Sequence, residues 1–135
     1  MKKILSAVLV LTVFILAACG GGSGRTEAVG TPAPVPVEFA GQTNPLGADA
    51  AVAGAEIFKN NCTACHGEQG HGDGPAGAAL NPAPRNLSAL AAIVGDDYLF
   101  WRVSAGKAGT SMIGWKGVLT NEQIWQVVSF IRTLK

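Results

Sequence analysis

A five-residue motif, Cys62-Thr63-Ala64-Cys65-His66, constrains the fold of this chain more than any other feature. Two thiols three positions apart can each form a thioether bond with one of the two vinyl groups of a haem, and the following histidine can then bind the iron. A structural zinc site normally needs four protein ligands, and the chain has no second cysteine pair. A redox-active dithiol usually accompanies a βαβ pattern, which the sequence lacks. The motif therefore predicts one covalent haem c, attached at Cys62 and Cys65 and ligated by His66.

The one other cysteine of the sequence, Cys19, directly follows a segment with the pattern of an export signal. Lys2 and Lys3 precede an apolar run over 4–18, whose 15 residues are too few for a bilayer span of about 20. We therefore expect a lipoprotein signal peptide over 1–18 and a diacylglycerol on Cys19. The alternatives are an ordinary secretory signal or an uncleaved N-terminal helix. No cysteine is then left for a disulfide.

The chain after the signal divides into a linker and one small domain. Glycines and prolines dominate 19–48, which predicts a flexible, lipid-anchored linker with an average reach of roughly 30 Å. The folded domain is expected over 49–135. Without Lys2 and Lys3, the chain has eight basic and nine acidic residues. This charge balance gives no support to a nucleic-acid partner.

The domain itself has the pattern of an all-α protein. Helices are expected over 50–60 with Asp49 as N-cap, over 87–94, and over 98–105 with Gly106 as the stop. A capping box at Thr120 and Gln123 starts an amphipathic last helix. No segment has the pattern of a substantial strand. A haem would supply much of the core that so small a domain lacks.

Two residues are candidates for the second axial ligand of the iron. His71 follows His66 by only five residues, and a chain that short passes around the haem edge with difficulty. Met112 lies 46 residues after His66 in a Gly-rich loop, which permits an approach from the other face. We therefore predict that Met112 is the ligand and that His71 lies on a surface loop. With both axial positions filled, the iron has no open site for a substrate, which favours electron transfer.

From residue 50 to residue 135, the chain resembles the class I c-type cytochromes. Gly54 and Phe58 occupy the positions of that family's Gly/aromatic pair in the first helix, and Phe130 that of its aromatic in the last helix. The loop over 106–112 resembles the family's axial methionine loop, although Ile113 replaces the proline found there in many relatives. The resemblance implies a cytochrome c fold with three to five helices around one haem c.

The resemblance also implies roles for residues around the haem. The segments 70–75 and 81–87 are similar to a bacterial branch of the family, in which a proline carbonyl accepts the Nδ1 proton of the proximal histidine. Pro82 and Pro84 are the two candidates for this carbonyl. Trp115 is a candidate donor to a haem propionate, and Arg85 or Arg102 could offset the propionate charge.

Together these features predict an exported, membrane-tethered electron carrier that is not an enzyme. It would pass single electrons between membrane redox complexes, as a monomer or within a complex, on the periplasmic or extracytoplasmic side. Two alternatives stay open: a fixed cytochrome c subunit of a quinol-oxidising or terminal oxidase complex, and a haem-based sensor or ligand-binding module. The sequence does not identify the electron donor or the acceptor.

Overall fold

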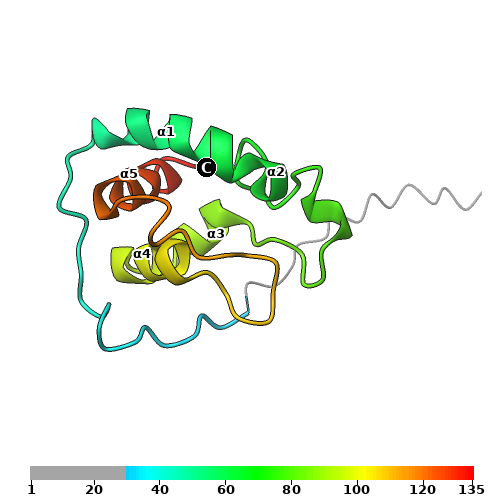
Figure 1. Ribbon diagram of the computed structural model, residues 1–135, viewed down its shortest axis with the longest axis horizontal. Helices are drawn as coiled ribbons and strands as arrows, with labels where there is room; N and C mark the ends of the chain where they lie inside the picture. The colour runs from blue at the N-terminus through cyan, green and yellow to red at the C-terminus, as the bar shows by residue number, and fades with distance from the viewer. Residues whose placement is uncertain (1–29) are drawn as a thin grey trace, which may run out of the picture.

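The computed structural model describes residues 30–135, and the predicted signal peptide and Cys19 lie outside this range. The described residues form five α-helices and one short 3-10 helix, with no β-sheet (Figure 1). The elements are α1 (Ala50–Asn61), α2 (Thr63–His66), η1 (Gly77–Ala79), α3 (Leu87–Ala91), α4 (Asp96–Ala105) and α5 (Asn121–Ile131). The predicted all-α class is confirmed. None of these helices combines the length and the apolar character needed to cross a membrane.

The helix ends show which local signals the sequence carried. The predicted capping box of α5 is present: Thr120 Oγ1 accepts from Gln123 N at 3.1 Å, and Gln123 Oε1 accepts from Thr120 N at 2.9 Å. Asn86 caps α3 by accepting from the amide of Ala89. Asp49 is the N-cap residue of α1, as predicted, but its backbone is already in helical conformation and its side chain makes no capping hydrogen bond.

The centre of the domain is the crossing of α1 and α5. Gly54 lies against the backbone of α5, where a Cβ added to it would be 1.9 Å from the carbonyl oxygen of Gln126. This close approach lets Phe58 pack on Phe130, with ring centroids 5.0 Å apart. The predicted role of Gly54, Phe58 and Phe130 at a helix crossing is therefore confirmed.

The remaining core lies between α4 and α5. Phe100 and Trp125 are both buried and stack with ring centroids 4.1 Å apart. Trp125 therefore has a structural role in the core. Leu87 and Leu90 bring α3 into the same core and also line a cavity that the helices enclose.

Residues 30–48 form what we call the N-terminal strap, and they correct the prediction of a linker up to residue 48. The strap runs along α4 before it reaches α1 (Figure 1). Val35, Phe39 and Leu46 are half-buried against the core, and Phe39 lies 6.3 Å from Phe100 between ring centroids. The packed part of the chain therefore begins well before Asp49.

Polar contacts fasten the strap at several points. Asn44 donates from its side chain to the carbonyl of Trp125 at 3.1 Å and to Ser129 Oγ at 2.8 Å. The backbone amides of Asn44 and Gly41 donate to the carboxylates of Asp96 and Asp97, respectively. These bonds give the backbone of the strap the partners that it lacks within a helix or sheet.

Replacing Asn44 with alanine should destabilise the domain by about 1–3 kcal/mol, because two donated hydrogen bonds are lost at a half-buried site. Urea unfolding of the holoprotein measures this change. Thr43→Ala is the control, since Thr43 is exposed in the same segment. An equal effect of the two variants would contradict the role assigned to Asn44.

Candidate haem-binding site

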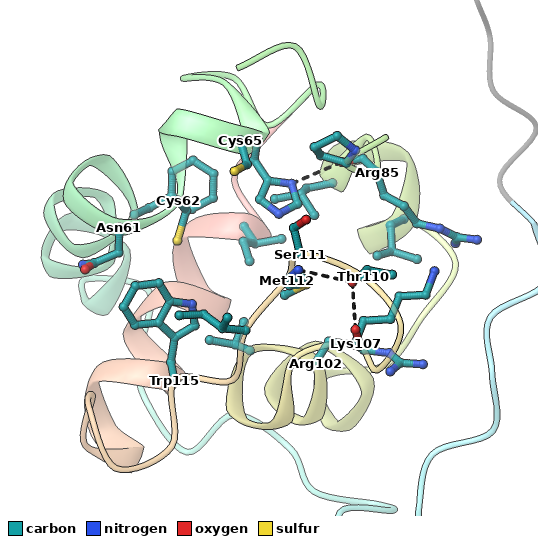
Figure 2. A pocket seen from close by; sticks show the side chains of 18 of the residues that line it. Asn61, Cys62, Cys65, Arg85, Arg102, Lys107, Thr110, Ser111, Met112 and Trp115 are labelled. Carbon is teal, nitrogen blue, oxygen red and sulfur yellow. Dashed lines mark hydrogen bonds between the residues drawn. The ribbon is translucent and has the colours of Figure 1, made fainter. Parts of the chain in front are cut away.

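A cavity of about 410 Å³ lies between the motif on α1 and α2 and the loop that follows α4. Its size falls within the usual range of ligand pockets. Figure 2 shows Cys62 and Cys65 on one side and the loop with Ser111 and Met112 facing them. The cavity brings together all the predicted haem-site residues: Cys62, Cys65, His66, Pro82, Pro84, Arg85, Met112 and Trp115.

The two thiols are placed by a sharp junction between helices. Cys62 lies at the junction between α1, which ends at Asn61, and the short helix α2. Cys65 lies within α2, and both thiols line the cavity. Burial, and to a smaller degree the neighbouring Cys65, raises the pKa of the Cys62 thiol to about 12. Because the thiolate is the reactive form, this site suits a sulfur held in a permanent thioether better than a reactive redox thiol.

His66 closes α2 and presents its imidazole to the cavity. Its Nδ1 lies 3.4 Å from the backbone carbonyl oxygen of Arg85. Burial lowers the pKa of His66, and the hydrogen bond to Arg85 opposes this shift only in part. The imidazole is therefore neutral at neutral pH, and a proton on Nδ1 leaves the Nε2 lone pair free to bind iron.

The partner of His66 differs from the prediction, which named the carbonyl of Pro82 or Pro84. The carbonyl of Pro84 faces Gly72 instead, since a Cβ added to Gly72 would lie 2.3 Å from that oxygen. The carbonyl that faces His66 is the next one along the chain, that of Arg85. Both prolines still line the cavity.

Met112 is carried by a loop that hydrogen bonds within itself. The amide of Lys107 donates to the carbonyl of Met112 at 2.9 Å, and the amide of Met112 donates to Thr110 Oγ1 at 3.2 Å (Figure 2). Thr110 Oγ1 in turn donates to the carbonyl of Lys107 at 2.7 Å. These bonds stiffen the loop although Ile113 stands where many relatives have proline.

The charged residues in the cavity lining suit a group with carboxylates. Arg85, Arg102 and Lys107 contribute to the lining, and no acidic residue of the described chain does. Arg102 stacks on Trp101, 3.7 Å from the ring centroid, and donates to the hydroxyl of Tyr98. Nη1 of Arg85 is buried and has no hydrogen-bond partner within residues 30–135. An unsatisfied buried donor of this kind fits a haem propionate.

Sequence reasoning also missed residues that line the haem cavity. The predicted surface residue His71, in contrast, lies apart from it. Lys107 and Thr110 were not predicted as site residues, although Gly106 and Gly109 beside them mark a tight loop that folds back on the cavity. His71 is exposed, and its Nε2 lies 3.2 Å from the backbone oxygen of Lys135. It is absent from the cavity lining, as expected of a surface residue.

Comparisons with known proteins agree with this geometry. The family model for cytochrome c matches residues 51–135. A search of curated proteins gives no match. Among solved structures, a chain of the Kuenenia stuttgartiensis reducing HAO-like protein complex has a TM-score of 0.55 at 20% identity, covering 80% of this chain and 49% of that one. The c-type cytochrome KustC0563 has a TM-score of 0.53 at 21% identity, covering 61% of this chain and 96% of that one.

These likenesses to solved structures show a shared fold, and the chain spans about half the length of the first of them. The family match covers more than half of the chain and includes the attachment motif with both thiols. Proteins of this family transfer electrons by means of their haem. The chain therefore belongs to the cytochrome c family, with the all-α fold of a class I c-type cytochrome and one haem c bound covalently.

Proposed function

We propose that this cytochrome is a one-electron carrier whose iron has His66 and Met112 as its axial ligands. The observation that carries the proposal is the placement of these two side chains in the lining of one cavity, although 46 residues separate them in the chain. The haem supplies a one-electron iron couple, and a thioether ligand raises its reduction potential. The chain contributes a neutral imidazole, a sulfur on a stiff loop and basic groups at the cavity wall.

Electron transfer suits this site better than catalysis. With both axial positions filled by protein, the iron has no open position for oxygen, peroxide or another substrate. Within residues 30–135, no cluster of three or more histidine, cysteine or acidic side chains could hold a second metal. The cofactor therefore serves as a carrier in this proposal, and the protein is not an enzyme.

We further propose that the cytochrome works at a membrane surface, tethered by lipid on Cys19. Gly30 contacts the domain through its carbonyl oxygen, which accepts from Arg85, and Gly30 follows the proposed lipid attachment point by only eleven residues. A chain of eleven residues spans at most roughly 40 Å. The proposed donor and acceptor are thus redox complexes in the same membrane, within this distance of its extracytoplasmic face.

The experiment compares native membranes from cells with the natural chain and with Cys19→Ser. We expect the natural cytochrome to sediment with the membranes and to be reduced and reoxidised there by respiratory substrates. The variant should appear in the soluble fraction and lose at least about tenfold in its rate of reduction by membranes at equal haem concentration, because the tether raises the local concentration.

The outcome that would contradict the carrier role is a haem that membranes neither reduce nor reoxidise. Purification in mild detergent separates a free carrier from the alternative of a fixed subunit. A free carrier elutes alone, whereas a subunit elutes in constant proportion with other proteins. The second result would replace the shuttle by a cytochrome c subunit.

A further inference from the structure

Arg85 differs from the other basic residues of the haem cavity because its two terminal nitrogens have opposite environments. Nη2 donates to the carbonyl oxygen of Gly30 at 2.9 Å. Nη1 is buried and has no partner within the described part of the chain. The strap therefore holds one side of the guanidinium, while the other side is buried without a partner in a residue that lines the cavity.

We propose that the N-terminal strap is a functional part of the haem site: through the carbonyl of Gly30 it aims Nη1 of Arg85 at a haem propionate and thereby raises the reduction potential. This inference rests on the role as an electron carrier, for which the potential matters. A guanidinium beside a propionate offsets negative charge that would otherwise favour ferric iron. Arg85 is thus a positioned group, and the strap is what positions it.

The strap can do this because it is fastened along its length. Asn44 binds the backbone and side chain of α5, and the amide of Gly41 binds Asp97. Closer to Gly30, Val35 packs on the hydrophobic core. Gly30 therefore belongs to a docked segment, and its carbonyl oxygen reaches Arg85, which lies 55 residues later in the chain.

Gly30 offers a local way to disturb this contact without touching the core. A Cβ added to Gly30 would lie 3.2 Å from Nη2 of Arg85, so the guanidinium must shift by a few tenths of an ångström to admit a side chain there. Gly47 in the same strap has nothing within 4 Å of an added Cβ. Both glycines are exposed, and neither has positive φ. Gly30→Val and Gly47→Val are therefore a matched pair.

The test is the reduction potential of the purified holoprotein, measured by redox titration of its absorbance. Arg85→Gln should shift the equilibrium about tenfold toward the ferric form, which is about 59 mV for a one-electron couple. Gly30→Val should shift it about threefold in the same direction, and Gly47→Val should leave it unchanged. In the double variant, Gly30→Val should add nothing to Arg85→Gln, because the contact that it disturbs is already gone.

Two outcomes would overturn the proposal. An unchanged potential in Arg85→Gln would show that this guanidinium does not act on the haem. Additive shifts in the double variant, or equal shifts from the two valines, would show that the strap acts without Arg85. The carrier role is tested by a different measurement, the reduction of the haem by native membranes. Its failure would leave the comparison of reduction potentials unchanged.

Discussion

Met112→Ala should abolish the weak far-red absorption band that ferric haem shows when methionine and histidine are its axial ligands. The reduction potential should fall by on the order of 100 mV or more, within the span of about 0.8 V that axial ligands control. The physical reason is the loss of a soft thioether, which favours ferrous iron. Visible absorption spectroscopy and redox titration of the same sample measure both effects.

A residue outside the cavity lining provides the control for this variant. Val118 is 71% exposed, lies on the same connection between α4 and α5, and is not among the residues that line the cavity. Val118→Ala should keep the far-red band and nearly the natural potential, because it leaves the hydrogen bonds of Lys107, Thr110 and Met112 in place.

Carbon monoxide supplies a second measurement on the same pair. The ferrous Met112→Ala protein should bind carbon monoxide at neutral pH, since one axial position is open. The natural protein and Val118→Ala should bind it weakly or not at all. Persistence of the far-red band in Met112→Ala would rule out the ligand assignment. Ready binding of carbon monoxide by the natural protein would instead favour the sensor alternative.

The helices could be predicted from the sequence because their signals are local. The capping box at Thr120 and the stop at Gly106 specify helix ends through residues three or four positions apart. The short helices α2 and η1 carry no such signal, and both fall in the segment expected to be motif and loop. Asp49 occupies the predicted N-cap position, but its side chain makes no capping hydrogen bond, which depends on a backbone conformation that residue type alone does not specify.

The strap could not be predicted because its contacts are remote in sequence. Asn44 lies 81 residues before the carbonyl of Trp125, and Gly41 lies 56 residues before Asp97. A Pro- and Gly-rich composition indicates a linker unless such partners are known. Phe39 and Leu46 were the local signal of packing, because segments that stay fully solvated are poor in large apolar side chains.

Within the haem site, residue types were predictable and backbone directions were not. The thiols, His66 and Met112 are identified by chemistry and spacing, and all four line one cavity. The choice of carbonyl for His66 depends on which way each peptide of the segment 82–85 points. In the structure, the carbonyl of Pro84 lies beside Gly72 and that of Arg85 lies beside His66. A change at Gly72 would therefore act on the haem site through the backbone.

Gly54→Val should be the most damaging single change to the fold, because it forces apart the two helices that cross at the centre of the domain. An added Cβ would lie 1.9 Å from the carbonyl oxygen of Gln126 and 2.5 Å from its carbon, and neither backbone atom can move without α5. The free energy of unfolding should fall by about 3 kcal/mol or more, at the upper end of overpacking effects. This is a large fraction of the total for a small domain.

The matched control for Gly54→Val is the same substitution one position earlier. Ala53 is exposed on α1, so Ala53→Val should cost only the difference in helix propensity, about 0.5 kcal/mol. Urea unfolding of the two holoproteins, followed by far-UV circular dichroism, gives the comparison. Equal stability of the two variants would contradict the close crossing of α1 and α5. A selective loss in Gly54→Val would show that the close crossing of α1 and α5 stabilises the domain.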